Sequence, residues 1–332
     1  WFMYTDSDLD VFDRYAYQHA KYLIIDDRTA VVMSENLSPS SLPYDDKSDG
    51  TYGRRGVALL TDATAVVEHL AGLFARDLDA ANHVDVVQWQ ADHPDYGRPA
   101  PTFVPLTVTG GTTYTVRHPA PLTVQETLAI EFVQSPDNNL HTASGLIGLV
   151  NRAGAGDEVL VEQLSERPYW GATSSNAAAD PNLRLEAYLA AARRGASVRI
   201  LLDAYFDDSD APTSNRATCT YVNDIAAAED LDLACALGNP TGAGIHNKMV
   251  LVSVAGVGTV HVGSINGTEM SNKGNRELAL QVQSQAAYEL LADMFARDWP
   301  HDVYLPLVLH NYQGPASHVL ISEVMYNPAG PD

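Results

Sequence analysis

Residues 246–266, HNKMVLVSVAGVGTVHVGSIN, contain two apolar segments of strand length, with His-x-Lys before the first and Ser-x-Asn after the second. Residues 19–36, HAKYLIIDDRTAVVMSEN, repeat the same order with a loop that is three residues shorter. A third apolar segment follows each copy, near residues 278–282 and 57–60. Apolar runs of this length between polar turns predict buried β-strands. We therefore expect two copies of one three-stranded unit.

A matching helix closes each copy. Residues 65–77 (AVVEHLAGLFARD) and 286–298 (AAYELLADMFARD) both have amphipathic spacing and both end in Phe-Ala-Arg-Asp. Further elements precede the second copy. They are helices at 145–153 and 182–194, the latter stopped by Gly195, and strands at 158–164 and 197–203. Strands that alternate with helices predict an α/β fold with a largely parallel, buried sheet.

This organisation divides the chain into residues 1–82, 83–120, 121–302 and 303–332. We expect the C-terminal part of a first half, a Pro-, Thr- and Gly-rich linker able to hold a small strand pair, a complete second half, and a connector with the first strand of a truncated domain. The second half has over a hundred residues before its histidine motif, so roughly a hundred N-terminal residues of the first half are expected to be missing. If they were cleaved, that N-terminal fragment should stay bound, because the first sheet would otherwise expose apolar edges.

The net charge restricts the partners of the chain. The 332 residues carry 20 Lys and Arg against 42 Asp and Glu, which gives a formal charge of −22. This charge repels polyanions, so extended nonspecific nucleic-acid binding is disfavoured unless the basic residues gather in one cleft. No run of eighteen apolar residues occurs, so the sequence predicts no membrane-spanning helix.

The two cysteines, Cys219 and Cys235, are compatible with one disulfide or with two inert thiols. They have no CxxC pattern and no neighbouring paired histidines, so we expect no metal site. An acidic, lysine-poor and tyrosine-rich chain favours the disulfide and a secreted or extracytoplasmic location. Residues 1–10, WFMYTDSDLD, lack a signal-peptide pattern, so we expect a longer parent chain.

Side-chain alternation places the motif residues of each copy on one face of the strands. His19 and Lys21 are two positions apart on an extended chain, so they are expected to meet the same substrate group. Ser34 and Asn36 repeat this spacing on the next strand. A phosphate suits the set, because the ammonium neutralises charge, the Ser and Asn side chains donate hydrogen bonds and the imidazole attacks phosphorus. The second copy offers the equivalent residues His246, Lys248, Ser264 and Asn266.

The first copy resembles H-x-K-x4-D-x6-G-S-x-N, the pattern of the phospholipase D superfamily, with Asp26 as its Asp and Met33 in place of Gly. In the second copy Ser253 stands where the family has Asp. The resemblance covers most of residues 14–300. It implies two similar α/β half-domains, each a mixed, mostly parallel β-sheet flanked by helices, with the active site at the pseudo-twofold interface between them.

The resemblance also implies a reaction without metal or other cofactor, in which one histidine attacks phosphorus and the other protonates the leaving alkoxide. Residues 275–277, Asn-Arg-Glu, match the family's N-x-E, whose carboxylate usually bonds the histidine of the opposite half. The equivalent position in the first half is Gly56. We therefore expect Glu277 to orient His19 as the nucleophile. His246 would then be the general acid, without a carboxylate partner and with a lowered pKa.

Charged residues near the motifs add to the predicted site. Asp26 has either a catalytic or a structural role, and Arg54 with Arg55 is expected near the mouth, adding positive charge for a phosphate. Residues 44–50 and 207–210 are acidic but lack the EF-hand order, so they predict solvated loops rather than calcium sites.

Aromatic and histidine residues outside the motifs have simpler interpretations. Tyr205 and Phe206, together with Tyr169 and Trp170, predict either an apolar rim for acyl chains or core packing. His69 and His261 are expected in packing or surface roles.

The preferred substrate is a phospholipid head-group phosphodiester, hydrolysed or transferred to another alcohol, with contact to a membrane surface. Strong negative charge supports this preference over nucleic acid. The alternative is a secreted, metal-independent nuclease, because residues 321–328, ISEVMYNP, resemble the start of a lamin-tail domain, which often accompanies such enzymes. A degenerate, non-enzymatic scaffold ranks third, since both histidines, both lysines and both asparagines are present.

Overall fold

The computed structural model describes residues 2–4, 14–38, 41, 53–92, 97, 98, 102 and 121–300, all within the first of two compact units, residues 1–300 and 301–332. The lamin-tail-like segment, the acidic stretch at 44–50 and the predicted strand pair of the linker lie outside the described residues. No helix in the described part of the chain combines the length and the apolar character needed to cross a membrane.

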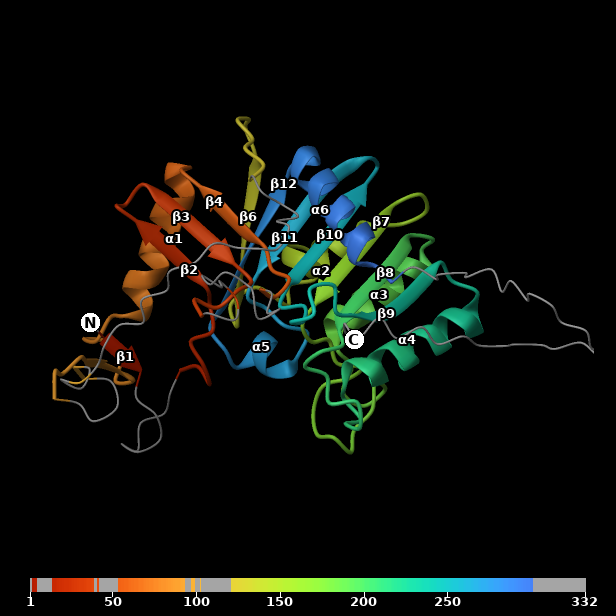
Figure 1. Cartoon of the computed structure of the whole chain (residues 1–332), viewed down its shortest axis with the longest axis horizontal. Coiled ribbons are helices and arrows are strands. Elements are labelled where there is room, and N and C mark those ends of the chain that lie inside the picture. The colour runs from red at the N-terminus through yellow and green to blue at the C-terminus, as the bar shows by residue number, and fades with distance from the viewer. Residues whose placement is uncertain are drawn as a thin grey trace, which may run out of the picture. The chain divides into compact units, whose positions relative to one another are not determined.

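The described elements follow the order expected for two related halves (Figure 1). The first half contains β1 Phe2–Tyr4, β2 Tyr22–Ile25, β3 Thr29–Met33, β4 Ala58–Thr61 and α1 Thr64–Asp77, followed by β5 Val86–Gln88. The second contains β6 Ala129–Ser135, α2 Gly145–Val150, β7 Glu158–Gln163, α3 Leu183–Arg193, β8 Ser197–Asp203, α4 Asn215–Glu229, β9 Leu233–Gly238, β10 Lys248–Val254, β11 Val257–Gly263, α5 Glu269–Lys273, β12 Glu277–Gln283 and α6 Gln285–Asp298. Strand β5 lies in the region predicted as a linker, and it pairs with β1 of the first half.

A seven-stranded mixed sheet with flanking helices forms the second half, in the order β6-β12-β11-β10-β7-β8-β9. The predicted α/β class is confirmed, but the expectation of a mostly parallel sheet is wrong. Only the β7–β8 and β8–β9 pairs are parallel, because α3 and α4 are the crossover connections there. The other pairs are antiparallel, and a two-residue turn of positive φ, Ala255 and Gly256, joins β10 directly to β11.

The predicted repeat is present in the strand register. In the first half β2, β3 and β4 form an antiparallel sheet in which Met33 pairs with Ala58. In the second half β10, β11 and β12 are arranged in the same way, with Gly263 paired with Ala279. The helices α1 and α6 then pack against β3 and β11, respectively.

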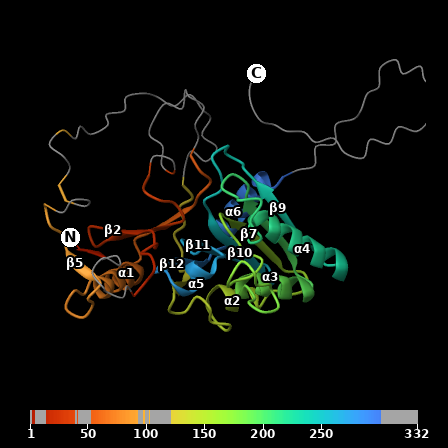
Figure 2. The same cartoon turned by 90° about the horizontal axis from the view of Figure 1, so that it is seen from below.

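The core lies on both faces of the large sheet, because strand side chains alternate. Val159 and Val161 of β7 face a cluster formed with α2, α3 and α4, whereas Leu160 faces the opposite cluster. Figure 2 shows α2 and α3 on one side of this sheet and α6 on the other. The second cluster also contains Leu70 of α1 and Val32 of β3, so a shared apolar core joins the two halves.

The two cysteines are bonded to each other, which decides between the alternatives that the sequence left open. Cys219 lies on α4 and Cys235, 16 positions later, on β9, so the bond fastens α4 to the edge strand it precedes. Both residues are buried in the cluster that also contains Val222 and Leu233.

Removing this bond should destabilise the protein. Replacing Cys219 and Cys235 together by Ala should lower the free energy of unfolding by about 3 kcal/mol, the loop-entropy value for a closed loop of roughly 15 residues. Denaturant unfolding of the variant and of the oxidised wild type measures this difference. Equal unfolding free energies for the two proteins would contradict the expected contribution of the bond.

Candidate active site

The two histidine motifs are held together by an exchange of backbone hydrogen bonds between the halves. The N–H of His19 donates to the carbonyl of Arg276 at 2.9 Å, and the N–H of His246 donates to the carbonyl of Arg55 at 2.8 Å. Each motif therefore lies beside the segment that leads into the third strand of the opposite half. The equivalence of these contacts agrees with the pseudo-twofold relation that the family resemblance implies.

Two buried ion pairs connect the halves next to these hydrogen bonds. Arg276 Nε lies 3.0 Å from Asp77 Oδ2, and Arg55 Nη2 donates to Asp298 Oδ1 at 2.9 Å. Both aspartates are the last residue of the repeated Phe-Ala-Arg-Asp sequence. Arg55 is accordingly a structural residue rather than a phosphate ligand at the mouth, because its guanidinium is buried and bonded to Asp298.

Glu277 contacts His19, as the sequence predicted. The Nδ1 atom of His19 lies 2.8 Å from Oε1 and 2.7 Å from Oε2 of Glu277. The carboxylate is fully buried and also accepts a hydrogen bond from Asn275 Nδ2 at 3.0 Å. A carboxylate that accepts the Nδ1 proton keeps the lone pair of the imidazole on Nε2, which is the nitrogen available for attack.

His246 also has a carboxylate neighbour, so the expectation that it lacks one is wrong. Oε2 of Glu35, the residue between Ser34 and Asn36, lies 3.3 Å from His246 Nδ1. The backbone carbonyl of Ser34 lies 3.0 Å from the same nitrogen. The family pattern has an acid at the position of Gly56, so the sequence predicted no role for the carboxylate of Glu35.

The glycine at position 56 explains where this carboxylate lies. A Cβ atom on Gly56 would lie 2.1 Å from Oε1 and 2.3 Å from Cγ of Glu35, so only glycine leaves room for the Glu35 side chain. In the second half the equivalent positions are Ile265 and Glu277, which is the reverse distribution of acid and apolar residue. The signal in the sequence was the pairing of an acid inside Ser-x-Asn with a glycine at the family's carboxylate position.

Burial determines the protonation behaviour of His246. Desolvation lowers the pKa of His246 below its usual value, while the nearby carboxylate of Glu35 acts in the opposite direction. The direction agrees with the lowered pKa expected for the general acid. The side chain of His246 is 6% exposed, whereas that of His19 is 30% exposed, so the two imidazoles have different surroundings.

The two motif lysines form a cationic centre with depressed pKa values. Lys21 Nζ donates to the carbonyl of His19 at 2.6 Å, and Lys248 Nζ donates to the carbonyl of His246 at 2.8 Å. Burial lowers the pKa of Lys21 to about 8, and burial together with the charge of Lys21 lowers that of Lys248 to about 7. The two ammonium groups are thus near enough to repel each other, and an anion between them would favour their charged forms.

The serine hydroxyls are not phosphate ligands, which corrects the predicted roles of Ser34 and Ser264. Both side chains are fully buried. Ser34 Oγ accepts from the N–H of Val57 at 3.0 Å, and Ser264 Oγ accepts from the N–H of Leu278 at 3.0 Å. These hydroxyls therefore continue the strand pairing within each half. The half-buried Asn36 and Asn266 follow the same strands, and their role as phosphate ligands stays a prediction.

Other predicted residues lie away from the histidines or in the core. Asp26 is exposed in the turn after β2 with a φ of 52°, so it is a turn residue and not a member of the site. Tyr169 and Trp170 are buried, and Trp170 Nε1 donates to the carbonyl of Gly267, so they belong to the core rather than to a rim. Tyr205 and Phe206 are exposed, which is compatible with the predicted rim.

His69 and His261, for which the sequence predicted packing or surface roles, both have packing roles. His69 stacks on Phe132 at 3.7 Å between ring centroids, and its Nε2 lies 2.8 Å from Gln134 Nε2. His261 is buried on β11, and burial lowers its pKa to about 3.

Exchanging the acid between its two positions tests the role of Glu35. Glu35→Gln and Gly56→Ala should each lower kcat on a phosphodiester by about tenfold or more, because both disturb the carboxylate beside the general acid. Both should also move the basic limb of the pH profile to lower pH, since Glu35 raises the pKa of His246. Glu35→Ile combined with Gly56→Glu should recover activity relative to Glu35→Ile alone.

The matched control for this series is Gly72→Ala, where the added Cβ would meet its nearest neighbour, Arg76 Nη1, at 3.8 Å. This variant should behave as wild type. An unchanged pH profile in Glu35→Gln would show that Glu35 does not act through His246.

The depressed lysines predict that anion binding takes up protons. At pH 8 part of Lys21 and most of Lys248 are neutral in the free protein, and a bound tetrahedral anion favours their charged forms. Affinity for sulfate, which does not titrate in this range, should fall as the pH rises from about 7 to 9. Calorimetry at pH 8 in buffers of different ionisation enthalpy measures the uptake. Binding without net proton uptake would contradict the lowered pKa values.

Comparisons with known proteins find similarity over part of the chain. Residues 172–299 match the family model described as "Cardiolipin synthase, PLD-like domain". No curated protein matches the chain. Similar solved structures include the phospholipase D family member Nuc from Salmonella typhimurium, with 18% identity, a TM-score of 0.38 and coverage of 52% of this chain and 95% of that one.

Two further structures are similar to this chain. NucT from Helicobacter pylori has 14% identity and a TM-score of 0.38, covering 52% of this chain and 96% of that one. Phosphatidylserine synthase from Haemophilus influenzae has 10% identity and a TM-score of 0.46, covering 84% of this chain and 61% of that one. Residues 172–299, which are less than half of the chain, are therefore similar to a PLD-like domain.

Proposed function

We propose that this protein cleaves phosphodiesters through a phosphohistidine formed on His19. The observation that carries the proposal is the contact between His19 Nδ1 and the buried carboxylate of Glu277, contributed by the opposite half. This arrangement leaves Nε2 of His19 as the unprotonated nitrogen. His246 is the second imidazole at the same interface, and burial lowers its pKa, which suits a group that must release a proton.

The reaction has two displacements at phosphorus. In the first, the Nε2 lone pair of His19 forms the P–N bond while the P–O bond to the leaving alcohol breaks, and the departing oxygen takes a proton from His246. In the second, His246 accepts a proton from water, the water oxygen forms a new P–O bond, and the P–N bond breaks with its electron pair returning to His19. The carboxylate of Glu277 stabilises the imidazolium of His19 between the two steps.

The remaining residues stabilise the charge on the phosphoryl oxygens. The ammonium groups of Lys21 and Lys248 lie at the histidines, and Asn36 and Asn266 add side-chain amides at the ends of the same strands. Charge-assisted hydrogen bonds from fixed donors stabilise the extra negative charge of the transition state. These groups belong to the protein itself, so the proposed steps use no metal.

A phospholipid head-group phosphodiester is the proposed substrate, cleaved by water or transferred to another alcohol. The net charge of −22 supports it over a nucleic acid, because a long polyanion would be repelled along most of the surface. The disulfide between Cys219 and Cys235 supports an oxidising compartment, in accordance with a secreted or extracytoplasmic enzyme.

Variants of His19 and His246, assayed in the presence of EDTA, test which histidine is the nucleophile and which is the general acid. With a phospholipid labelled at phosphorus, His246→Asn should accumulate labelled protein, because attack still occurs while the later water step loses its base. His19→Asn should form no labelled protein and should lose at least about 10² in rate. The matched control is His141→Asn, an exposed histidine outside the site, which should retain wild-type rates.

Single-stranded DNA serves as the second substrate in the same assay. Head-group release that depends on His19 supports the phospholipase, whereas DNA cleavage with the same dependence and no lipid turnover would establish the nuclease instead. Wild-type protein that takes up no label from either substrate would overturn the catalytic proposal.

A further inference from the structure

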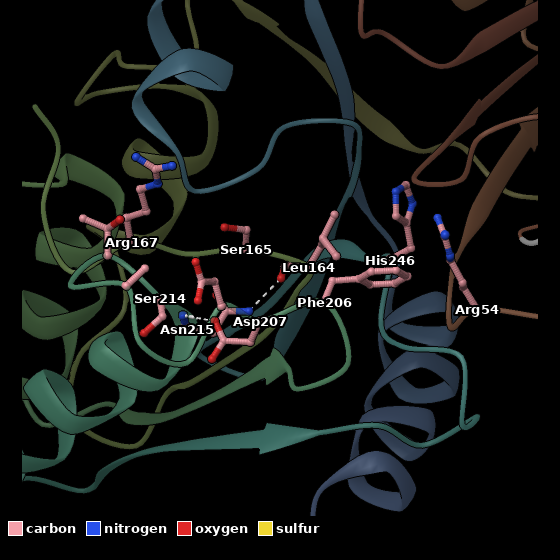
Figure 3. A pocket seen from close by; sticks show the side chains of 12 residues that line it. Arg54, Leu164, Ser165, Arg167, Phe206, Asp207, Ser214, Asn215 and His246 are labelled. Carbon is pink, nitrogen blue, oxygen red and sulfur yellow. Dashed lines mark hydrogen bonds between the residues drawn. The ribbon is translucent and has the colours of Figure 1, made fainter. Parts of the chain in front are cut away.

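A pocket of about 580 Å³ opens beside His246, which is one of its lining residues (Figure 3). Its wall is formed by the loops that follow β7 and β8, by the start of α4, and by Arg54 of the first half. His19 does not line it. Pockets in α/β folds commonly lie at the carboxyl ends of parallel strands, and this one lies at the ends of β7 and β8.

Two carboxylates, those of Asp203 and Asp207, accept backbone hydrogen bonds that hold the loop after β8 in place. Asp203, which is fully buried, accepts the N–H of Phe206 and the N–H of Ile245, both at 2.6 Å. It thereby ties the pocket wall to the residue before His246. Asp207 accepts the N–H groups of Asn215 at 2.6 Å and Arg216 at 3.1 Å, so its charge is engaged at the start of α4. The pocket is therefore a preformed feature of the fold.

The cationic groups of the pocket are Arg54 and Arg167. Figure 3 shows their side chains on opposite sides, with His246, Ser165 and Phe206 between them. The guanidinium of Arg54 lies over the Phe206 ring, 4.5 Å from its centroid. Asp207 and the exposed Asp208 also line the pocket, and the charge of Arg167 acts on Glu269. Within the described part of the chain, neither guanidinium forms a direct ion pair with a carboxylate. The charge of Arg54 also acts on His246 and Lys248, so it lies near the reaction centre.

The position of the pocket identifies which part of a substrate it would hold. In the proposed mechanism His246 protonates the departing oxygen, so the alcohol attached to that oxygen lies on the side of His246. A volume of about 580 Å³ is sufficient for a polar head group. The assignment of the leaving alcohol to the side of His246, and the inference built on it, rest on the proposed function.

We propose that this pocket binds a leaving group that carries a negative charge of its own, such as a phosphorylated polyol head group. Two arginines can each form bidentate hydrogen bonds with a phosphate. A quaternary ammonium group is disfavoured, because Arg54 already occupies a face of the Phe206 ring and would repel a second cation there. The overall charge of −22 opposes long polyanions, so the small anionic head group is favoured over a nucleic-acid strand.

An internal competition assay tests this selectivity. Vesicles that contain phosphatidylcholine and phosphatidylinositol 4-phosphate in equal amounts present both substrates on one surface, so differences in vesicle binding cancel. Wild-type protein in EDTA should release inositol 4-phosphate at least about tenfold faster than choline, the ratio expected for one charge-assisted contact. The readout is the ratio of the two kcat/KM values, measured by mass spectrometry of the water-soluble products.

Replacing each arginine should change this ratio. Arg54→Gln and Arg167→Gln should each lower the selectivity ratio about tenfold, since each removes one charged contact to the anionic head group. The matched control is Arg152→Gln, an exposed arginine outside the pocket, which should leave both the ratio and the rates unchanged. A circular dichroism spectrum and an unfolding midpoint equal to those of wild type establish that the variants are folded.

Three results would overturn the inference. The first is faster release of choline than of the inositol product, and the second is a selectivity ratio that the arginine substitutions leave unchanged. The third is cleavage of a single-stranded oligonucleotide that is faster than cleavage of either lipid and depends in the same way on Arg54 and Arg167. Failure of the proposed function looks different, because wild-type protein would then form neither product nor labelled histidine from any of the substrates.

Discussion

Two buried ion pairs, Arg276 with Asp77 and Arg55 with Asp298, set the register in which the halves of this protein meet. Such pairs add little net stability, because desolvation offsets the attraction, but leaving one partner buried without the other costs about 3–5 kcal/mol. Any arrangement of the halves that separated them would carry this penalty twice. The backbone carbonyls of the same two arginines accept the N–H groups of His19 and His246, so the pairs also position the imidazoles.

The interface is symmetric in its backbone and asymmetric in its carboxylates. Glu277 begins β12 and contacts His19, whereas the acid near His246 is Glu35, which follows β3 and occupies the space left by Gly56. A buried, close carboxylate stabilises the charged imidazole that follows attack on phosphorus. Burial lowers the pKa of the other imidazole, and the contact with Glu35 opposes this shift. The duplicated fold can thus give its two histidines different roles in one reaction.

Much of the fold and part of the site follow from local pattern. The repeated helix ending in Phe-Ala-Arg-Asp and the two His-x-Lys strands predicted two related units, and α3 and β8 lie where the spacing of apolar residues placed them. The contact of Glu277 with His19 was predicted from the N-x-E resemblance. The directions of the strands in the sheet were predicted less accurately, because strand direction depends on the connections between strands. A short turn at Ala255 and Gly256 gives an antiparallel pair that apolar runs alone do not distinguish from a parallel one.

The sequence by itself therefore determined the repeat, the α/β class and the identity of the histidines and lysines, because these are properties of residue type and spacing along the chain. Only the tertiary structure decided that Glu35 lies beside His246, that the hydroxyls of Ser34 and Ser264 are bonded inside the sheets, and that Arg54 reaches the pocket. Each of these depends on contacts between residues distant in sequence. The physical reason is that a side chain's partner is set by the volume and hydrogen-bonding groups that folding brings to it, as the missing Cβ of Gly56 does for Glu35.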